Sequence, residues 1–164
     1  MKLATFVFTS LICHFTYASV ESDLQKYLDL AQQKQLDQQT TWQRLMYADQ
    51  KQNSEVTYAG YFYAKDGKTN LKSELQANIK ALFLEAPDNQ SIRCKFPARS
   101  RWLKQQLNID VQQLPKVNCV EFNDWINQIK PHKATLIYAT DFMGNPSSMF
   151  GHTLLRLDPK DQKQ

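Results

Sequence analysis

The feature that most limits what this chain can fold into is the apolar run at residues 3–15, which follows the single charge of Lys2. The run ends at Thr16-Tyr17-Ala18, a small-x-small pattern that suits signal peptidase. A charged start, a short apolar stretch and a cleavage pattern are typical of a secretory signal. The alternative, a membrane anchor, is disfavoured because a spanning helix needs ~20 residues. We therefore expect residues 1–18 to be removed and the remainder to fold after export.

The remaining residues, 19–164, have the length of one domain of modest size. The hydrophobic content of 42% and the aromatic content of 12% are enough to build a core. The formal net charge is +4, and it falls to about +3 when Lys2 leaves with the signal. So mild a balance does not favour a nucleic-acid partner, and the sequence leaves the oligomeric state open.

Cys94 and Cys119 are the two cysteines that remain after Cys13 leaves with the signal. A pair of cysteines in an exported chain favours one disulfide. Its loop of about 26 residues would contribute roughly 3.5 kcal/mol in the chain-entropy description. Free structural thiols and a functional thiol remain open alternatives. A metal site is disfavoured because no Cys-x-x-Cys or nearby histidine completes one, so we expect no metal and no cofactor.

Apolar residues spaced three and four apart predict several helices before residue 130. One of them opens at Thr40, which with Gln43 resembles a capping box, and another is led by Pro97. The expected helices are residues 21–35, a second starting at Thr40, a long one from Leu71 to Phe83, a short one after Pro97, and 120–129.

Strands are expected where β-branched, aromatic or continuous apolar residues replace the helical spacing. The expected segments are 134–140, 153–158 and 54–64, the last of which suits either a strand or an extended segment, with a turn at 66–68. No later stretch is long and apolar enough to cross a membrane. We divide the chain into the signal 1–18, a mainly helical region 19–117, and a β-containing region 118–164.

The segment 145–157 carries the most chemistry. Gly151 allows an unusual backbone conformation just before His152. His152 starts the last strand, where it shares a face with Leu154 and Arg156 and is well placed to act as a general base. On spacing alone, the simpler interpretation is a histidine hydrogen-bonded to the preceding loop.

Other polar residues have simpler explanations than catalysis. Ser147 and Ser148 are expected to cap a short helix, because no Gly-x-Ser-x-Gly surrounds them. Arg99 and Arg101 are expected to be solvated surface cations, with anion binding as the alternative. His132, next to Pro131, is expected in a loop.

Three blocks of this sequence resemble the Lnb N-terminal periplasmic domain family: Cys94-Lys-Phe-Pro-Ala-Arg, Cys119-Val-Glu-Phe-Asn-Asp-Trp, and Asn145-Pro-Ser-Ser-Met-Phe-Gly-His-Thr-Leu-Leu-Arg-Leu. The resemblance runs roughly over residues 42–158. Lnb itself is a membrane-associated acyl transferase that moves a fatty acyl chain to the N-terminus of a lipoprotein. The resemblance implies a Gram-negative protein that lies in the periplasm or cell envelope after cleavage of the signal.

The same resemblance implies an α+β protein: a helical N-terminal region followed by the start of a circularly permuted papain-like domain, similar to NlpC-type peptidases, with an incomplete antiparallel sheet. His152 then matches the catalytic base, and Asn145, Ser147, Ser148, Gly151 and Arg156 would support the site. In the family, an Asn-Cys pair follows the histidine much later. That pair is not found by Gln164, so we expect this chain to be a fragment that is inactive and poorly stable.

Three functions compete. The first is a cysteine-type acyl transferase or hydrolase acting on lipids or lipoproteins, with membrane lipid or lipoprotein as partner of the full-length protein. The second is a non-enzymatic periplasmic binding or scaffold module. The third is a peptidoglycan amidase or peptidase. Likeness of fold alone does not decide between them.

Overall fold

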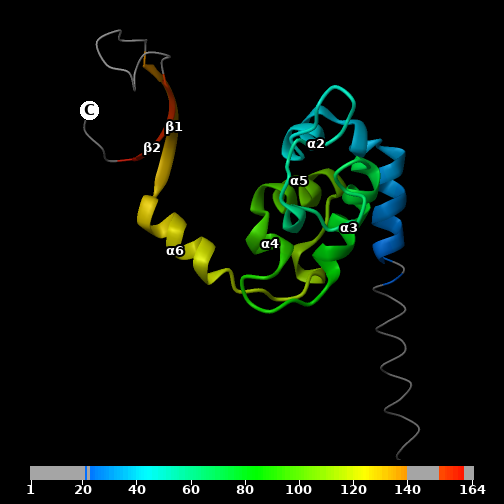
Figure 1. The fold of residues 1–164 in the computed structure, drawn as a ribbon. Helices are drawn as coiled ribbons and strands as arrows, with labels where there is room; N and C mark the ends of the chain where they lie inside the picture. The colour runs from blue at the N-terminus through cyan, green and yellow to red at the C-terminus, as the bar shows by residue number, and fades with distance from the viewer. Residues whose placement is uncertain (1–20, 22, 140–151, 161–164) are drawn as a thin grey trace, which may run out of the picture. The chain divides into compact units, whose positions relative to one another are not determined.

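The structure is a computed structural model that describes residue 21, residues 23–139 and residues 152–160. Within these residues, helices and short turns come first and a two-stranded antiparallel sheet follows (Figure 1). This order confirms the α+β class. The chain divides into two compact units, Met1–Asn118 and Cys119–Gln164, which are described separately below.

The first unit is helical wherever it has regular structure. Its first described helix covers residues 23–33, within the predicted 21–35. The remaining elements are η1 (Leu36–Gln38), α2 (Thr40–Leu45), η2 (Ala59–Tyr61), α3 (Leu71–Phe83), α4 (Ile92–Lys95), α5 (Pro97–Leu107) and η3 (Val111–Gln113).

The core of this unit is centred on Trp42 of α2, whose side chain is fully buried. Its ring stacks on Trp102 of α5 with the centroids 5.7 Å apart, and its indole N–H donates to the carbonyl of Leu71 at 3.1 Å. The first helix joins α3 through the stacked rings of Tyr27 and Phe83. Burying large aromatic rings in such pairs contributes most of the packing energy of a small core.

Local sequence sets the ends of these helices, with one correction. Asn70 caps α3 by accepting a hydrogen bond from the amide of Ser73 at 3.0 Å, and Pro97 begins α5. The predicted capping box at Thr40 is wrong, because Gln39 is the N-cap of α2 and makes no side-chain cap. Thr40 already lies inside the helix, so its hydroxyl is one position too late to cap it.

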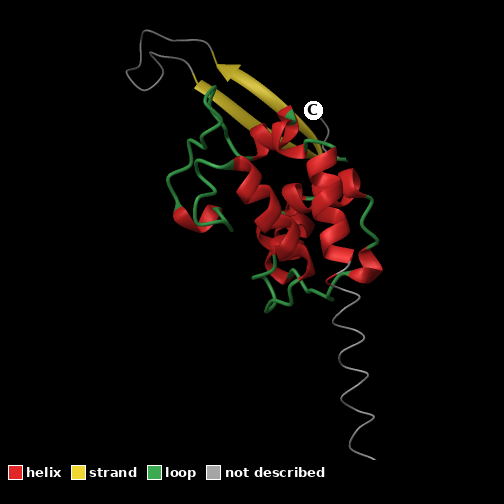
Figure 2. Ribbon diagram, turned by 90° about the vertical axis from the view of Figure 1, so that its right-hand side faces the viewer, coloured by secondary structure: helices red, strands yellow, loops and turns green. Residues whose placement is uncertain are grey.

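Of the two alternatives expected at 54–64, a strand or an extended segment, the strand is wrong. Among the described residues, Figure 2 draws strands only at β1 and β2. The segment instead makes one isolated bridge, between Ala48 and Ser54, and the single turn η2. Its backbone groups bond to side chains and to nearby loops rather than to a neighbouring strand, so β propensity without a pairing partner did not produce a sheet.

The second unit contains α6 (Val120–Ile129), β1 (Pro131–Ala139) and β2 (His152–Pro159). Lys130 ends α6 in the left-handed conformation, with φ of 44°, and β1 begins at the next residue. His132 lies in β1 rather than in a loop, at an irregularity in the register between Pro131 and Lys133.

The pairing of β1 with β2 fixes which residues share a face. Ala139 pairs with His152, Ile137 with Leu154, and Thr135 with Arg156 on one face. The other face carries Leu136, Tyr138 and Leu155, whose exposed fractions are 72%, 68% and 67%. No residue of α6 is buried either. Within its own described residues, this unit therefore leaves much of its apolar surface uncovered.

Candidate functional site

His152 is the first residue of β2, and its Cα pairs with that of Ala139 at the end of β1. Its side chain is exposed. The antiparallel pairing of β2 with β1 holds the backbone at this position. An exposed histidine held in this way at the start of β2 is available for proton transfer.

The same face carries a polar network at the far end of β2. Arg156 Nε pairs with Asp158 Oδ1 at 2.7 Å, and Thr135 Oγ1 donates to Asp158 Oδ2 at 3.1 Å. Asp158 is six residues beyond His152, which at ~3.3 Å per residue is about 20 Å along the strand. Asp158 therefore cannot orient the imidazole. Its hydrogen bond with Thr135 instead joins β2 to β1 at the other end of the hairpin.

The other residues predicted around His152 lie mostly outside the described part of the chain. These are Asn145, Ser147, Ser148 and Gly151. Arg156 is described, but its charge is paired with Asp158 rather than directed to His152. Both partners of this ion pair lie on β2, and a half-exposed pair of this kind contributes little to stability.

Cys94 and Cys119 are both disulfide-bonded. Because the sequence has one further cysteine, Cys13, which could bond only one of them, the bond joins Cys94 to Cys119. Hydrogen bonds between side chains and backbone join the segments that precede the two cysteines: the amide of Asn118 donates to the Asp88 carboxylate at 3.3 Å, and the Arg93 guanidinium donates to the carbonyl of Pro115. A sulfur in a disulfide is not a nucleophile, so neither cysteine supplies a thiolate in this oxidised form.

Arg99 corrects the prediction of a solvated cation, because only 2% of the residue is exposed. Its guanidinium Nη1 lies 3.5 Å from the carboxylate of Glu74, which is itself fully buried. The guanidinium also stacks over the rings of Tyr61 and Phe96, with its central carbon 3.9 Å and 4.0 Å from the ring centroids. Arg101, by contrast, is exposed as expected.

Glu74 anchors the end of segment 54–64, for which the sequence suggested a strand or an extended segment. Its carboxylate accepts the amide of Tyr63 at 2.9 Å and the amide of Ala64 at 2.8 Å. Arg99 holds the same loop by donating to the carbonyl of Tyr61 at 2.9 Å. Gly67 is required there, because a Cβ at this position would collide with the Glu74 carboxylate. The ion pair therefore fixes the shape of residues 61–67.

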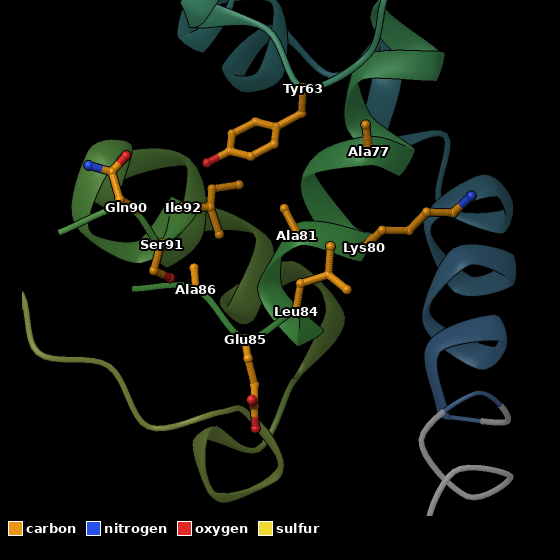
Figure 3. Close-up of a pocket in the computed structure, with 10 residues that line it drawn as sticks. All are labelled: Tyr63, Ala77, Lys80, Ala81, Leu84, Glu85, Ala86, Gln90, Ser91 and Ile92. Carbon is orange, nitrogen blue, oxygen red and sulfur yellow. The ribbon is translucent and has the colours of Figure 1, made fainter. Parts of the chain in front are cut away.

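A hollow of about 340 Å³ lies beside this loop, between α3 and the start of α4 (Figure 3). Ala77, Ala81, Leu84 and Ile92 are among its lining residues, and the hydroxyl of Tyr63 extends into it. Burial raises the pKa of Tyr63 above its usual value of 10.0, with Glu74 acting in the same direction and Arg99 against it. The phenol is therefore protonated at neutral pH and can donate a hydrogen bond.

Sequence reasoning missed Glu74 and Tyr63. Both residues lie in segments whose structure was predicted from residue patterns alone. Such a pattern places Glu74 on a helix but does not identify its partner, Arg99. The available signal was a carboxylate flanked by Leu71, Leu75 and Ile79 on the buried side of α3, since such a group must find a partner. In the part of the chain described, no cluster of side chains could hold a metal ion. No helix there is long and apolar enough to cross a membrane.

Two family models match the chain. Residues 34–106 match a domain of unknown function, DUF7843, and residues 121–164 match the Lnb N-terminal periplasmic domain. We found no match among curated proteins and none among solved structures. The first match contains the Glu74–Arg99 pair, and the second contains His152. Together they indicate an envelope protein in which a DUF7843-like helical region precedes a region similar to the Lnb N-terminal periplasmic domain.

Proposed function

We propose that residues 121–164 contribute the general base of a cysteine-type acyl transferase or hydrolase that acts on lipids or lipoproteins in the envelope. The observation that carries the proposal is the match of this region to the Lnb N-terminal periplasmic domain, within which His152 begins β2. The sequence around it, Ser147-Ser-Met-Phe-Gly-His, supports the same role for His152.

The chemistry gives His152 two tasks. A cysteine thiol loses its proton to the imidazole, and its sulfur attacks the acyl carbonyl to form a thioester while the ester C–O bond breaks. The imidazolium returns the proton to the departing alcohol oxygen. In the second half, the imidazole takes a proton from the acceptor, an amine or water, which attacks the thioester carbonyl while the C–S bond breaks. The imidazolium then returns this proton to the departing sulfur, which regenerates the thiol and the neutral imidazole.

This reaction needs a thiol that the described residues do not supply, because Cys94 and Cys119 are bonded to each other. Reading the gene past the codon of Gln164 is the first test. An Asn-Cys pair downstream in frame supports the proposal, and a longer reading frame without any cysteine contradicts it.

The second test is enzymatic and uses the complete gene product. His152→Ala is expected to lower lipoprotein acyl transfer, measured by mass spectrometry of the lipoprotein N-terminus, by about 100-fold or more. His132→Ala is the matched control, since His132 is also exposed and lies on the paired strand. Equal activity of both variants removes His152 from the mechanism. If cleavage of peptidoglycan cross-links falls instead, the amidase alternative gains.

A non-enzymatic binding or scaffold module is the second candidate, and one observation favours it. The hairpin presents Leu136, Tyr138 and Leu155 on one exposed face, which is the type of surface that proteins use for association. A complete product that lacks transfer and hydrolysis activity, yet is retained in the envelope together with a partner, would favour this function.

A further inference from the structure

We propose that the first unit binds an anionic amphiphile, with its alkyl chain beside α3 and its head group on the loop 57–68. The proposal rests on two adjoining hollows that have Tyr63 in common. It uses none of the residues assigned to acyl transfer, so either proposal can fail without the other.

The first hollow suits an alkyl chain. Half of its ten lining residues are small or aliphatic, namely Ala77, Ala81, Leu84, Ala86 and Ile92. Gln90 also lines it, and Figure 3 shows the side chains of Lys80 and Glu85 extending away from the hollow. Ser91 also lines it, but its hydroxyl is used to cap α4 by accepting the amide of Arg93. At ~30 Å³ for each water-sized volume, a hollow of about 340 Å³ accepts roughly eleven heavy atoms.

The second hollow suits an anionic head group. It has a volume of about 420 Å³, and its lining residues include Lys65, Lys68 and Thr57 and no acidic residue. The neighbouring Asp66 is directed elsewhere, since its carboxylate accepts from Ser73 Oγ at 2.7 Å and from Asn70 Nδ2 at 2.9 Å. The two lysines are therefore the charges that a ligand meets in this hollow.

Tyr63 joins the two hollows and is held in place before any ligand arrives. Its amide is fixed by Glu74, and its ring packs edge-on against Phe96 with the centroids 6.1 Å apart. Glu74 does not repel an anion strongly, because Arg99 compensates its charge at 3.5 Å. A preformed site loses less conformational entropy on binding than a loop that must first become ordered.

The binding test uses the 164-residue chain and dodecanoate below its micelle concentration, with binding measured by calorimetry and by the amide NMR signals of Tyr63 and Ala81. Dodecyl maltoside has the same chain with a neutral head, and acetate has the head without the chain. We expect dodecanoate to bind at least about tenfold more tightly than either. Equal binding of the maltoside contradicts the role of the lysines.

Two variants locate the ligand. Ala77→Leu fills the first hollow and is expected to weaken dodecanoate binding about tenfold. The double variant Lys65→Gln with Lys68→Gln removes the two cations of the second hollow and is expected to weaken binding about three- to tenfold. The matched controls are Ala98→Leu and Lys72→Gln, since both positions are exposed and line neither hollow. Unchanged binding in both test variants overturns the proposal, because the amphiphile then occupies another surface, such as the hairpin. Urea midpoints confirm that each variant is folded.

The last arm distinguishes a free amphiphile from a membrane lipid. Phosphatidylglycerol vesicles are compared with phosphatidylcholine vesicles in a flotation assay, using the same variants. Binding of monomeric dodecanoate identifies a free fatty acid as a sufficient ligand. Binding of phosphatidylglycerol vesicles alone, weakened by both test variants, identifies a lipid at the membrane surface. If neither dodecanoate nor phosphatidylglycerol binds, the proposal is wrong.

Discussion

The two units of this chain use similar apolar residues in opposite environments. In the first unit, Leu75 and Leu103 are 2% and 0% exposed, whereas in the second, Leu136 and Leu155 are 72% and 67% exposed. The spacing of apolar residues predicted the long helices of the first unit and the helix and two strands of the second. The comparison teaches that such a pattern identifies the face that favours burial, but not whether the same unit provides the surface that covers it.

The ion pairs of the two units also differ in how far they are buried. Glu74 and Arg99 are paired inside the first unit with almost no exposure, while Arg156 of the second unit keeps 49% of its side chain exposed beside Asp158. Removing one partner of a buried pair lowers stability strongly, because the remaining charge has neither a partner nor water around it. An exposed pair contributes little.

The largest effect is expected from Glu74→Ala, which leaves the Arg99 guanidinium buried without its carboxylate. The free energy of unfolding of the first unit should fall by about 3–5 kcal/mol, measured by urea denaturation. Glu55→Ala, at an exposed carboxylate, is the control and should stay within about 0.5 kcal/mol. If Arg99→Met restores stability in the Glu74→Ala background, the cost comes from the uncompensated charge.

The disulfide gives the next largest effect. Cys94→Ser with Cys119→Ser should lower stability by up to about 3.5 kcal/mol, because the unfolded chain regains the freedom of a loop of about 26 residues. Dithiothreitol should lower the stability of the unchanged protein by a similar amount and leave the double variant unaffected. An equal response of both proteins to dithiothreitol would show that the bond does not contribute to stability.

Paired leucine substitutions test the difference in burial directly. Leu75→Ala should cost about 3 kcal/mol because it opens a cavity in a packed core, whereas Leu155→Ala should cost less than about 0.5 kcal/mol. Hydrogen exchange on the same proteins should show slower exchange in α3 than in β2. A cost above about 2 kcal/mol for Leu155→Ala would mean that the hairpin face is covered in solution.

The smallest effect concerns Asp66, whose pKa is lowered from 3.8, mainly by the hydrogen bond from Ser73. A carboxylate with a folded pKa below its unfolded value stabilises the protein above the unfolded value, and this contribution is lost as pH falls through the folded pKa. Asp66→Asn should therefore flatten the decline in stability below about pH 4 and change little at pH 7. Lys72→Gln, on the exposed side of α3, is the control, and an unaltered acid limb in Asp66→Asn would contradict the prediction.

Sequence reasoning predicted the long helices, the order of helices before strands, and the positions of β1 and β2, because each of these depends on local periodicity. It failed at residues 54–64, where β-branched and aromatic residues fitted a strand, yet no partner strand exists among the described residues. It also placed Arg99 on the surface. Both errors have one cause, since Glu74 binds the loop backbone and the guanidinium together, and contacts across 10 to 25 positions leave no periodic trace in the sequence.

The candidate site shows the same limit. The hairpin position of His152 followed from the strand pattern, whereas the hollow beside Tyr63 could not be foreseen. That hollow forms where α3, α4 and the loop before α3 meet, and its walls include three alanines that no motif distinguishes. A sequence pattern indicates where a reactive side chain stands along the chain, while the empty space next to a side chain depends on tertiary packing.

The attachment of the loop through the Glu74 carboxylate has a consequence for how this protein can vary. The Glu74 carboxylate accepts hydrogen bonds from the main-chain amides of residues 63 and 64, so this attachment does not depend on the side chains that those residues carry. Any amino acid except proline, which lacks a backbone N–H, can make these hydrogen bonds. The chain can therefore exchange the chemical groups displayed at this spot, by mutation or by engineering, while the scaffold beneath them stays the same.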